Sequence, residues 1–106
     1  MGEVKTEPVT ATYQGTITDD RWTEAETWPA GGFGIEDHDR DGTRLWYRCP
    51  CGCDHVGFLR VGRNEKPAKS PSWNWNGSTE KPTLKPSVHH VGHWHGWLTD
   101  GVWRSC

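Results

Sequence analysis

Runs of apolar side chains, bounded by polar ones, flank the segment Cys49–Cys53 on both sides. The preceding residues, Thr43–Arg48, and the following ones, His55–Val61, are rich in aromatic and β-branched side chains. Short runs of this kind are typical of strands, and the segment between them contains Pro50 and Gly52, which favour a turn. The pattern therefore predicts a β-hairpin with the cysteines at its tip.

The rest of the chain also shows short strand-like runs separated by turn signals. Asp19-Asp20 and Asp100-Gly101 are turn signals, and residues 29–34 and 36–42 are expected to form a glycine-rich loop and an acidic turn. No stretch sustains a 3.6-residue apolar period, so few or no helices are expected. Further strands are expected twice within residues 11–28, at Ser72–Asn76, over Val88–Thr99 and over Val102–Cys106. We predict a mainly β fold, either a small antiparallel sheet sandwich or a partly open barrel, with residues 1–10 as a flexible leader and 11–106 as a single domain.

The composition predicts an aromatic core. The chain has 13 Leu, Ile and Val residues against 12 Trp, Tyr and Phe, eight of them Trp, and its mean hydropathy is −0.88. Disordered chains are poor in aromatics and carry high net charge, whereas the net charge here is only −2. A small domain with few aliphatic side chains needs an additional cross-link, and a structural metal ion is one way to provide it.

Three of the four cysteines lie in the turn Cys49-Pro50-Cys51-Gly52-Cys53. The N-terminal residues lack the apolar stretch of a signal peptide, and no apolar run approaches membrane-spanning length, so we expect a cytoplasmic protein without membrane contact. Thiols stay reduced in that compartment, and disulfides inside so short a turn would close very small rings. The cluster therefore predicts a site for one Zn²⁺ ion per chain, because thiolates are preferred zinc ligands.

Two histidines supply the remaining candidate ligands. His93 and His95 are two positions apart, which in a strand places both imidazoles on one face and Trp94 on the other. With the three cysteines they make five candidate donors for the four places of a tetrahedral zinc site, and the sequence does not decide which is spare. Cys106 is a possible substitute. The other four histidines are expected to be exposed or hydrogen-bonded: His38, His55, His89 and His90.

Other kinds of site are less well supported. Asp37–Gly42 resembles the start of a calcium-binding loop, but Arg48 stands where a bidentate Glu is needed, so an Asp/Gly turn is favoured. Trp73 and Trp75 could stack on single-stranded nucleic acid if they were exposed, but the basic residues are scattered and nucleic acid is an unlikely partner. The sequence contains no recognisable nucleophile triad, phosphate loop or H-E-x-x-H motif.

Four segments in order carry a resemblance to a known family: CPCGC, PSWNWNG, KPTLKPSV and GHWHGWLTDGVW, within residues 49–106. Their combination resembles a family of small phage and prophage proteins, often labelled ammonia monooxygenase in genomes. We set that label aside because nothing in the chain indicates a membrane oxygenase. Many relatives resemble Cys-x-x-His or Cys-x-His where this chain has His93 and His95, which keeps a zinc ligand and supports the site.

The resulting hypothesis is a zinc-binding module of phage or prophage type in the host cytoplasm. Zinc would be structural, and the module would bind a host or phage protein through its aromatic surface, so an enzyme is not the favoured class. Two alternatives stay open: a zinc-dependent hydrolase with three protein ligands and a bound water, and a single-stranded nucleic-acid binder using exposed Trp. The oligomeric state is not predicted.

Overall fold

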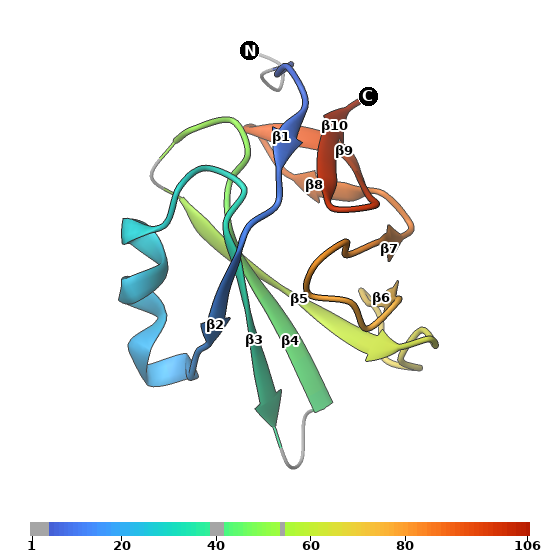
Figure 1. Cartoon of the computed structure of the whole chain (residues 1–106). Helices are drawn as coiled ribbons and strands as arrows, with labels where there is room; N and C mark the ends of the chain where they lie inside the picture. Colours follow the sequence, from blue (N-terminus) through green and yellow to red (C-terminus); the bar gives the residue numbers. More distant parts are fainter. Residues whose placement is uncertain (1–4, 39–41, 54) are drawn as a thin grey trace.

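The computed structural model describes residues 5–38, 42–53 and 55–106, which form two β-sheets around a shared core (Figure 1). Sheet A has the strand order β1-β10-β9-β8, and sheet B has the order β2-β3-β4-β5-β6-β7. The mainly β prediction is confirmed, in the form of two packed sheets rather than a closed barrel. The strands are β1 Val9–Thr10, β2 Tyr13–Thr16, β3 Phe33–His38, β4 Gly42–Arg48, β5 Val56–Arg63, β6 Trp73–Trp75, β7 Leu84–Lys85, β8 Val88–His90, β9 Trp94–Thr99 and β10 Val102–Ser105.

The hairpin around the cysteines forms the centre of sheet B. Strands β4 and β5 pair antiparallel, with Leu45 opposite Leu59 and Arg48 opposite Val56. Both leucines are buried, and so are Trp46 and Tyr47, because the two faces of β4 pack against different core clusters. The sheet is mixed, because β2 pairs parallel with β3 and β5 pairs parallel with β6, whereas only antiparallel pairing was expected.

Residues 11–38 differ most from the sequence prediction. The expected second strand within 11–28 is a 3₁₀ helix, η1 (Asp19–Thr27), and the expected acidic turn over 36–42 begins inside strand β3. Asp19 N–H donates to Glu36 Oε2 at 2.7 Å, and Glu36 is buried and also accepts from Trp46 Nε1. A buried carboxylate needs such donors, so Glu36 belongs in the sheet rather than in a turn. The calcium-loop alternative falls partly on residues 39–41, outside the described residues.

The predicted strand Val88–Thr99 is in fact a hairpin. Strands β8 and β9 pair antiparallel and are joined by the turn 91–93. Gly92 has φ = +79°, a conformation that glycine adopts without strain, and His93 N–H donates to the His90 carbonyl at 2.9 Å. Gly92 was the available signal, and the apolar alternation on either side of it concealed the turn.

The core is built from tryptophans, as the composition predicted. Trp75, Trp94 and Trp103 are fully buried, and each indole N–H finds an acceptor: Ser78 O, Thr6 Oγ1 and Gly31 O respectively. Trp103 lies on β10 yet donates to Gly31, just before β3, at 2.9 Å. It also contacts Tyr47 of β4, so this side chain connects the two sheets.

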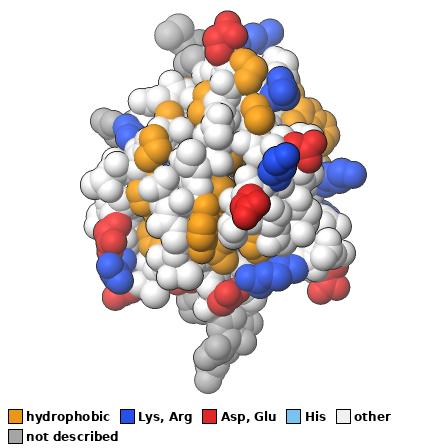
Figure 2. All heavy atoms as spheres, in the orientation of Figure 1, with side chains coloured by type: hydrophobic (Ala, Val, Ile, Leu, Met, Phe, Trp, Pro, Cys, Tyr) orange, Lys and Arg blue, Asp and Glu red, His pale blue; other side chains and the backbone are white. Residues whose placement is uncertain are grey.

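The surface gives little support to a nucleic-acid platform. Trp75 is 1% exposed, and Trp73 is partly buried with its indole N–H on the Ser87 carbonyl, so the two do not form an exposed stacking pair. On the face drawn in Figure 2, acidic and basic side chains are interspersed. No helix in the described part of the chain combines the length and apolarity needed to cross a bilayer.

The N-terminal segment reaches sheet A within the stretch expected to be a leader. Strand β1 pairs antiparallel with β10, with Val9 opposite Trp103. Thr6 N–H donates to Ser105 Oγ at 2.8 Å, near the other end of the chain. Residues 5–10 therefore contact the sheet that also carries the β8–β9 hairpin.

Candidate functional site

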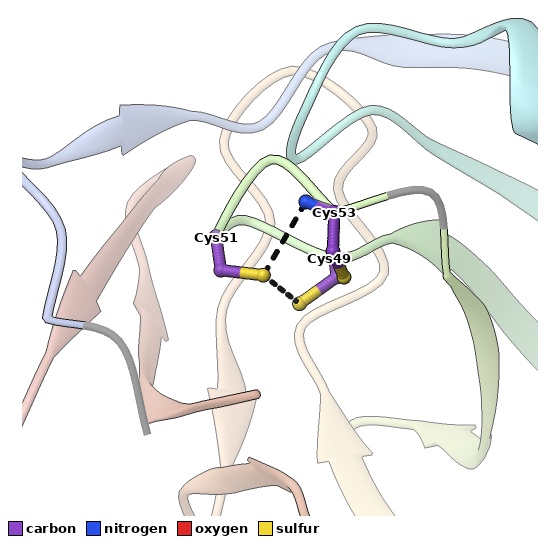
Figure 3. Close-up of side chains that lie close together, drawn as sticks. All are labelled: Cys49, Cys51 and Cys53. Carbon is purple, nitrogen blue, oxygen red and sulfur yellow. Dashed lines mark hydrogen bonds between the residues drawn. The ribbon is translucent and has the colours of Figure 1, made fainter. Parts of the chain in front are cut away.

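The connection between β4 and β5 gathers three thiols. Cys49 N–H donates to the His55 carbonyl at 3.0 Å, and Gly52 N–H donates to the Cys49 carbonyl at 3.1 Å, which closes a tight loop. The Sγ atoms of Cys49 and Cys51 are 3.2 Å apart, and Cys53 N–H points to Cys51 Sγ at 3.4 Å (Figure 3). All three Sγ atoms lie within 4.8 Å of one another. The short turn thus directs its thiols to one point, as predicted.

Imidazoles from the β8–β9 hairpin face the same loop. The donor atoms of Cys53, His55 and His93 also lie within 4.8 Å of one another, so the thiol cluster and the imidazoles share Cys53. The ring centroids of His55 and His93 are 4.2 Å apart, and those of His90 and His93 are 5.0 Å apart. The structure therefore forms two adjoining groups of possible ligands, one of three thiols and one of Cys53 with two imidazoles.

The three thiols differ in the direction in which their surroundings shift the pKa. Burial raises the pKa of the Cys49 thiol, and burial also raises that of Cys53. Burial opposes ionisation of Cys51 too, but hydrogen bonds from Cys53 and Cys49 outweigh it and lower the pKa of the Cys51 thiol. Without a cation, Cys51 is the first of the three to become a thiolate.

One ring nitrogen of His90, Nδ1, is buried without a hydrogen bond to any described residue. Burial, followed by the neighbouring His93 and His55, lowers its pKa, which favours the neutral ring that binds metals. A buried nitrogen without a partner, beside soft donors, fits a site that holds a cation. The donors are suited to Zn²⁺, which takes four thiolate or imidazole ligands.

The five candidate ligands are only partly brought together. Cys49, Cys51, Cys53 and His93 lie at the cluster, but His95 belongs to neither group of converging donors among the described residues, and nor does the exposed Cys106. The same-face rule for positions i and i+2 holds only inside a strand, and His93 lies in the turn before β9. The donor atom of His55 converges with those of Cys53 and His93 instead, and the His90 ring lies beside that of His93. His55 is exposed, as expected, but its place two residues after Cys53 was a local signal that it could be a ligand.

His95 faces a serine. Ser87 immediately precedes β8, and its Oγ lies 3.1 Å from His95 Nε2 on β9. In the β8–β9 register, Val88 opposes Gly96 and His89 opposes His95. Because Val88 is fully buried and side chains alternate along a strand, Ser87 and His89 share the outer face with His95. The hairpin therefore presents a hydroxyl and an imidazole at hydrogen-bond distance.

Neighbouring rings hold this pair in place. Trp73 Nε1 donates to the Ser87 carbonyl at 3.0 Å, which fixes the serine backbone from sheet B. The ring centroids of His89 and His95 are 4.6 Å apart, with an angle of 30° between the ring planes. Both Ser87 and His95 are partly buried, hence shielded but still accessible.

A serine hydrogen-bonded to an imidazole is an arrangement capable of nucleophilic catalysis. The imidazole can accept the hydroxyl proton as the oxygen attacks a carbonyl, and can return it to the leaving group. Sequence reasoning missed the pair because Ser87 and His95 become neighbours only through the β8–β9 register. Both residues do lie in the segments KPTLKPSV and GHWHGWLTDGVW that carry the family resemblance.

Comparison with known proteins agrees with the chemistry of this pair. Residues 18–106 match the family described as the bacterial ubiquitination-like system serine protease, BubE. No curated protein and no solved structure matches the chain. The match covers both the thiol and imidazole cluster and the Ser87–His95 pair. The chain therefore belongs to the family of bacterial ubiquitination-like system serine proteases.

Proposed function

We propose that the protein is a serine peptidase in which Ser87 is the nucleophile and His95 the general base. The observation that carries the proposal is the 3.1 Å distance between Ser87 Oγ and His95 Nε2, in a chain whose family is described as a serine protease. This distance is within the reach required for proton transfer. Family membership also favours an enzyme over the non-catalytic interaction module expected from the sequence.

The reaction proceeds by acyl transfer. His95 Nε2 accepts the hydroxyl proton while Ser87 Oγ bonds to the substrate carbonyl carbon, giving a tetrahedral intermediate. The intermediate collapses as His95 donates that proton to the leaving amine, and the C–N bond breaks to leave an acyl ester on Ser87. Water then attacks the ester, His95 takes a proton from the water, and Ser87 regains its hydroxyl proton as the carboxylic product leaves.

The family description places such enzymes in a bacterial ubiquitination-like system, and this supports a protein substrate for the present chain. A protein partner was also expected from the sequence. The origin of that partner, phage or host, stays a prediction from the resemblance. The exposed outer face of β8 and β9 is where its polypeptide would meet Ser87.

We further propose that the thiol cluster holds one Zn²⁺ ion with a structural role. Cys49, Cys51 and Cys53 would supply three ligands and His93 the fourth, with His90 and His55 beside them. Four such ligands close a tetrahedral site and leave no position for a catalytic water, and the ion would cross-link the loop 49–55 to the β8–β9 hairpin. The convergence of the donors and the orphaned His90 Nδ1 support this assignment.

Labelling with a fluorophosphonate tests the peptidase proposal, because this probe reacts with activated serine hydroxyls. We expect the intact protein to gain one phosphonyl group, and Ser87→Ala to gain none. His95→Ala should slow labelling by about 10³-fold or more, since loss of the base removes most of the activation. Ser70→Ala, which removes an exposed serine hydroxyl, is the matched control and should react like the parent protein.

Equal labelling of the parent protein and Ser87→Ala would refute the assignment. Hydrolysis that survives Ser87→Ala but is lost on removal of metal would favour the alternative of a zinc-dependent hydrolase. Metal analysis of protein purified without added metal tests the second proposal: one zinc per chain is expected, and none in Cys51→Ser combined with Cys53→Ser. Zinc retained by that double variant would contradict the ligand assignment.

A further inference from the structure

The proposed catalytic pair and the proposed metal site lie on a single short hairpin. Ser87 precedes β8 at the open end, His95 lies opposite His89 in the middle of the β8–β9 pairing, and His93 stands in the turn 91–93 that closes the hairpin. Strand β8 has three residues, so at about 3.3 Å per residue the turn is only about 10 Å from Ser87. A shift of the turn would therefore displace Ser87.

The two arms of the hairpin are held very differently. Strand β9 is paired on its other side with four residues of β10, whereas β8 is the last strand of sheet A. Val88 anchors the start of β8 in the core, and Trp73 holds the Ser87 carbonyl. At the far end, the His90 ring lies against Tyr47, with 5.8 Å between ring centroids, and Trp94 is fully buried. Between them the turn has little side-chain packing of its own, because Val91 is 75% exposed and Gly92 has no side chain.

What fixes the turn end is the group of imidazoles. His93 is partly buried against His55, and His90 completes the group. These rings approach one another edge to face, and His90 Nδ1 is left without a hydrogen bond among the described residues. Ring contacts of this kind constrain a turn weakly, whereas a shared cation would join it firmly to the cysteine loop of the β4–β5 hairpin, at the centre of sheet B.

We propose that His93 is a positioning residue for the catalytic pair. By binding the same ion as Cys49, Cys51 and Cys53, it fixes the turn of the β8–β9 hairpin to sheet B and so sets the position of Ser87 Oγ relative to His95 Nε2. The ion takes no part in the reaction and touches no substrate. This inference rests on both parts of the proposed function, the peptidase and the metal site.

The proposal explains why a metal site should accompany a metal-independent mechanism. Displacements of about 1 Å in a catalytic pair can cost about 10²-fold in rate. A three-residue edge strand between Ser87 and the turn has few other contacts to limit such displacements. The thiol and imidazole cluster supplies a restraint at the turn 91–93 itself, where Val91 is exposed and Gly92 has no side chain.

The test compares His93→Ala with His93→Cys in the full chain, purified with zinc, using three measurements: zinc content, fluorophosphonate labelling rate at Ser87 and hydrogen exchange. For His93→Ala we expect loss of zinc, labelling slower by about 10²-fold, and faster exchange over residues 88–99 but not over 33–48. His93→Cys restores a zinc ligand of similar reach and should restore zinc content, labelling and protection together. Chelation of the parent protein should reproduce the alanine variant.

Each other result overturns the proposal. A His93→Ala protein that keeps its zinc shows that His93 is not the ligand, and one that loses zinc but labels at the parent rate shows that the site does not position the pair. Faster exchange over the whole chain shows that the ion stabilises the fold in general rather than this hairpin. If the zinc-loaded parent protein is not labelled at Ser87 at all, the peptidase proposal itself fails; normal labelling that ignores the metal defeats only the positioning role.

Discussion

Replacement of Trp103 by Phe should cost the fold a large part of its stability. The indole N–H donates to the Gly31 carbonyl at 2.9 Å in a buried contact between the two sheets. A phenyl ring cannot donate, and a buried carbonyl without its donor costs about 1–3 kcal/mol. The smaller ring also leaves a void of about 40 Å³ beside Tyr47 and Trp94, worth about 1 kcal/mol at about 24 cal/mol per Å³. The expected total is about 2–4 kcal/mol.

Urea unfolding followed by tryptophan fluorescence measures this loss. With a slope of about 1–3 kcal/mol per molar urea for a small domain, the midpoint should fall by roughly 1–3 M. Trp97→Phe is the matched control, because Trp97 lies on the same β9–β10 hairpin but is 45% exposed, and its replacement should change stability by less than about 0.5 kcal/mol. Equal effects of the two substitutions would refute the view that Trp103 joins the sheets.

Substitutions at three further positions test the hairpin that carries the proposed catalytic pair. Gly96→Ala should destabilise the fold by about 3 kcal/mol in urea, because the added carbon would lie 2.0 Å from a backbone carbonyl oxygen of β10; an unchanged midpoint would contradict this. His89→Ala should slow fluorophosphonate labelling, whereas His89→Phe, which keeps a ring against His95, should not. Equal labelling rates for His89→Ala and His89→Phe would show that ring stacking does not hold His95 in position. Trp73→Phe removes the donor to the Ser87 carbonyl and should slow labelling roughly three- to tenfold, and an unaltered rate would show that this bond does not position the serine.

The parts of the fold that could be predicted are those set by local pattern. The hairpin of β4 and β5 follows from aromatic and β-branched runs on both sides of a Pro/Gly turn, and the β9–β10 turn follows from Asp100-Gly101, which both adopt positive φ. Strand β3 was missed because its glycine and acidic residues resemble a loop. Its place in the sheet depends on Glu36 finding buried donors from Trp46 and Asp19, which are tertiary contacts.

The same distinction applies to the candidate site. Cys49, Cys51 and Cys53 could be identified because a five-residue turn brings their thiols together by itself. His90 and His93 could not be placed beside them, since they approach the cysteine loop only when two hairpins from different sheets pack together, whereas His55 is two residues from Cys53. The position of His95 depends on a single turn. In an unbroken strand His95 would lie on the same face as His93, but His93 lies in the turn 91–93, and His95 lies on the outer face of β9 beside Ser87.

The order of the strands has a consequence for synthesis of the chain. Sheet B is built from one continuous stretch, β2 to β7, whereas sheet A combines β1 with β8, β9 and β10. As the polypeptide emerges from the ribosome, sheet B can therefore assemble early, while β1 has no partner until β10 has been made. Ser87 and His95 belong to the part that assembles last, so a nascent chain would carry a largely folded scaffold before the proposed catalytic pair has formed.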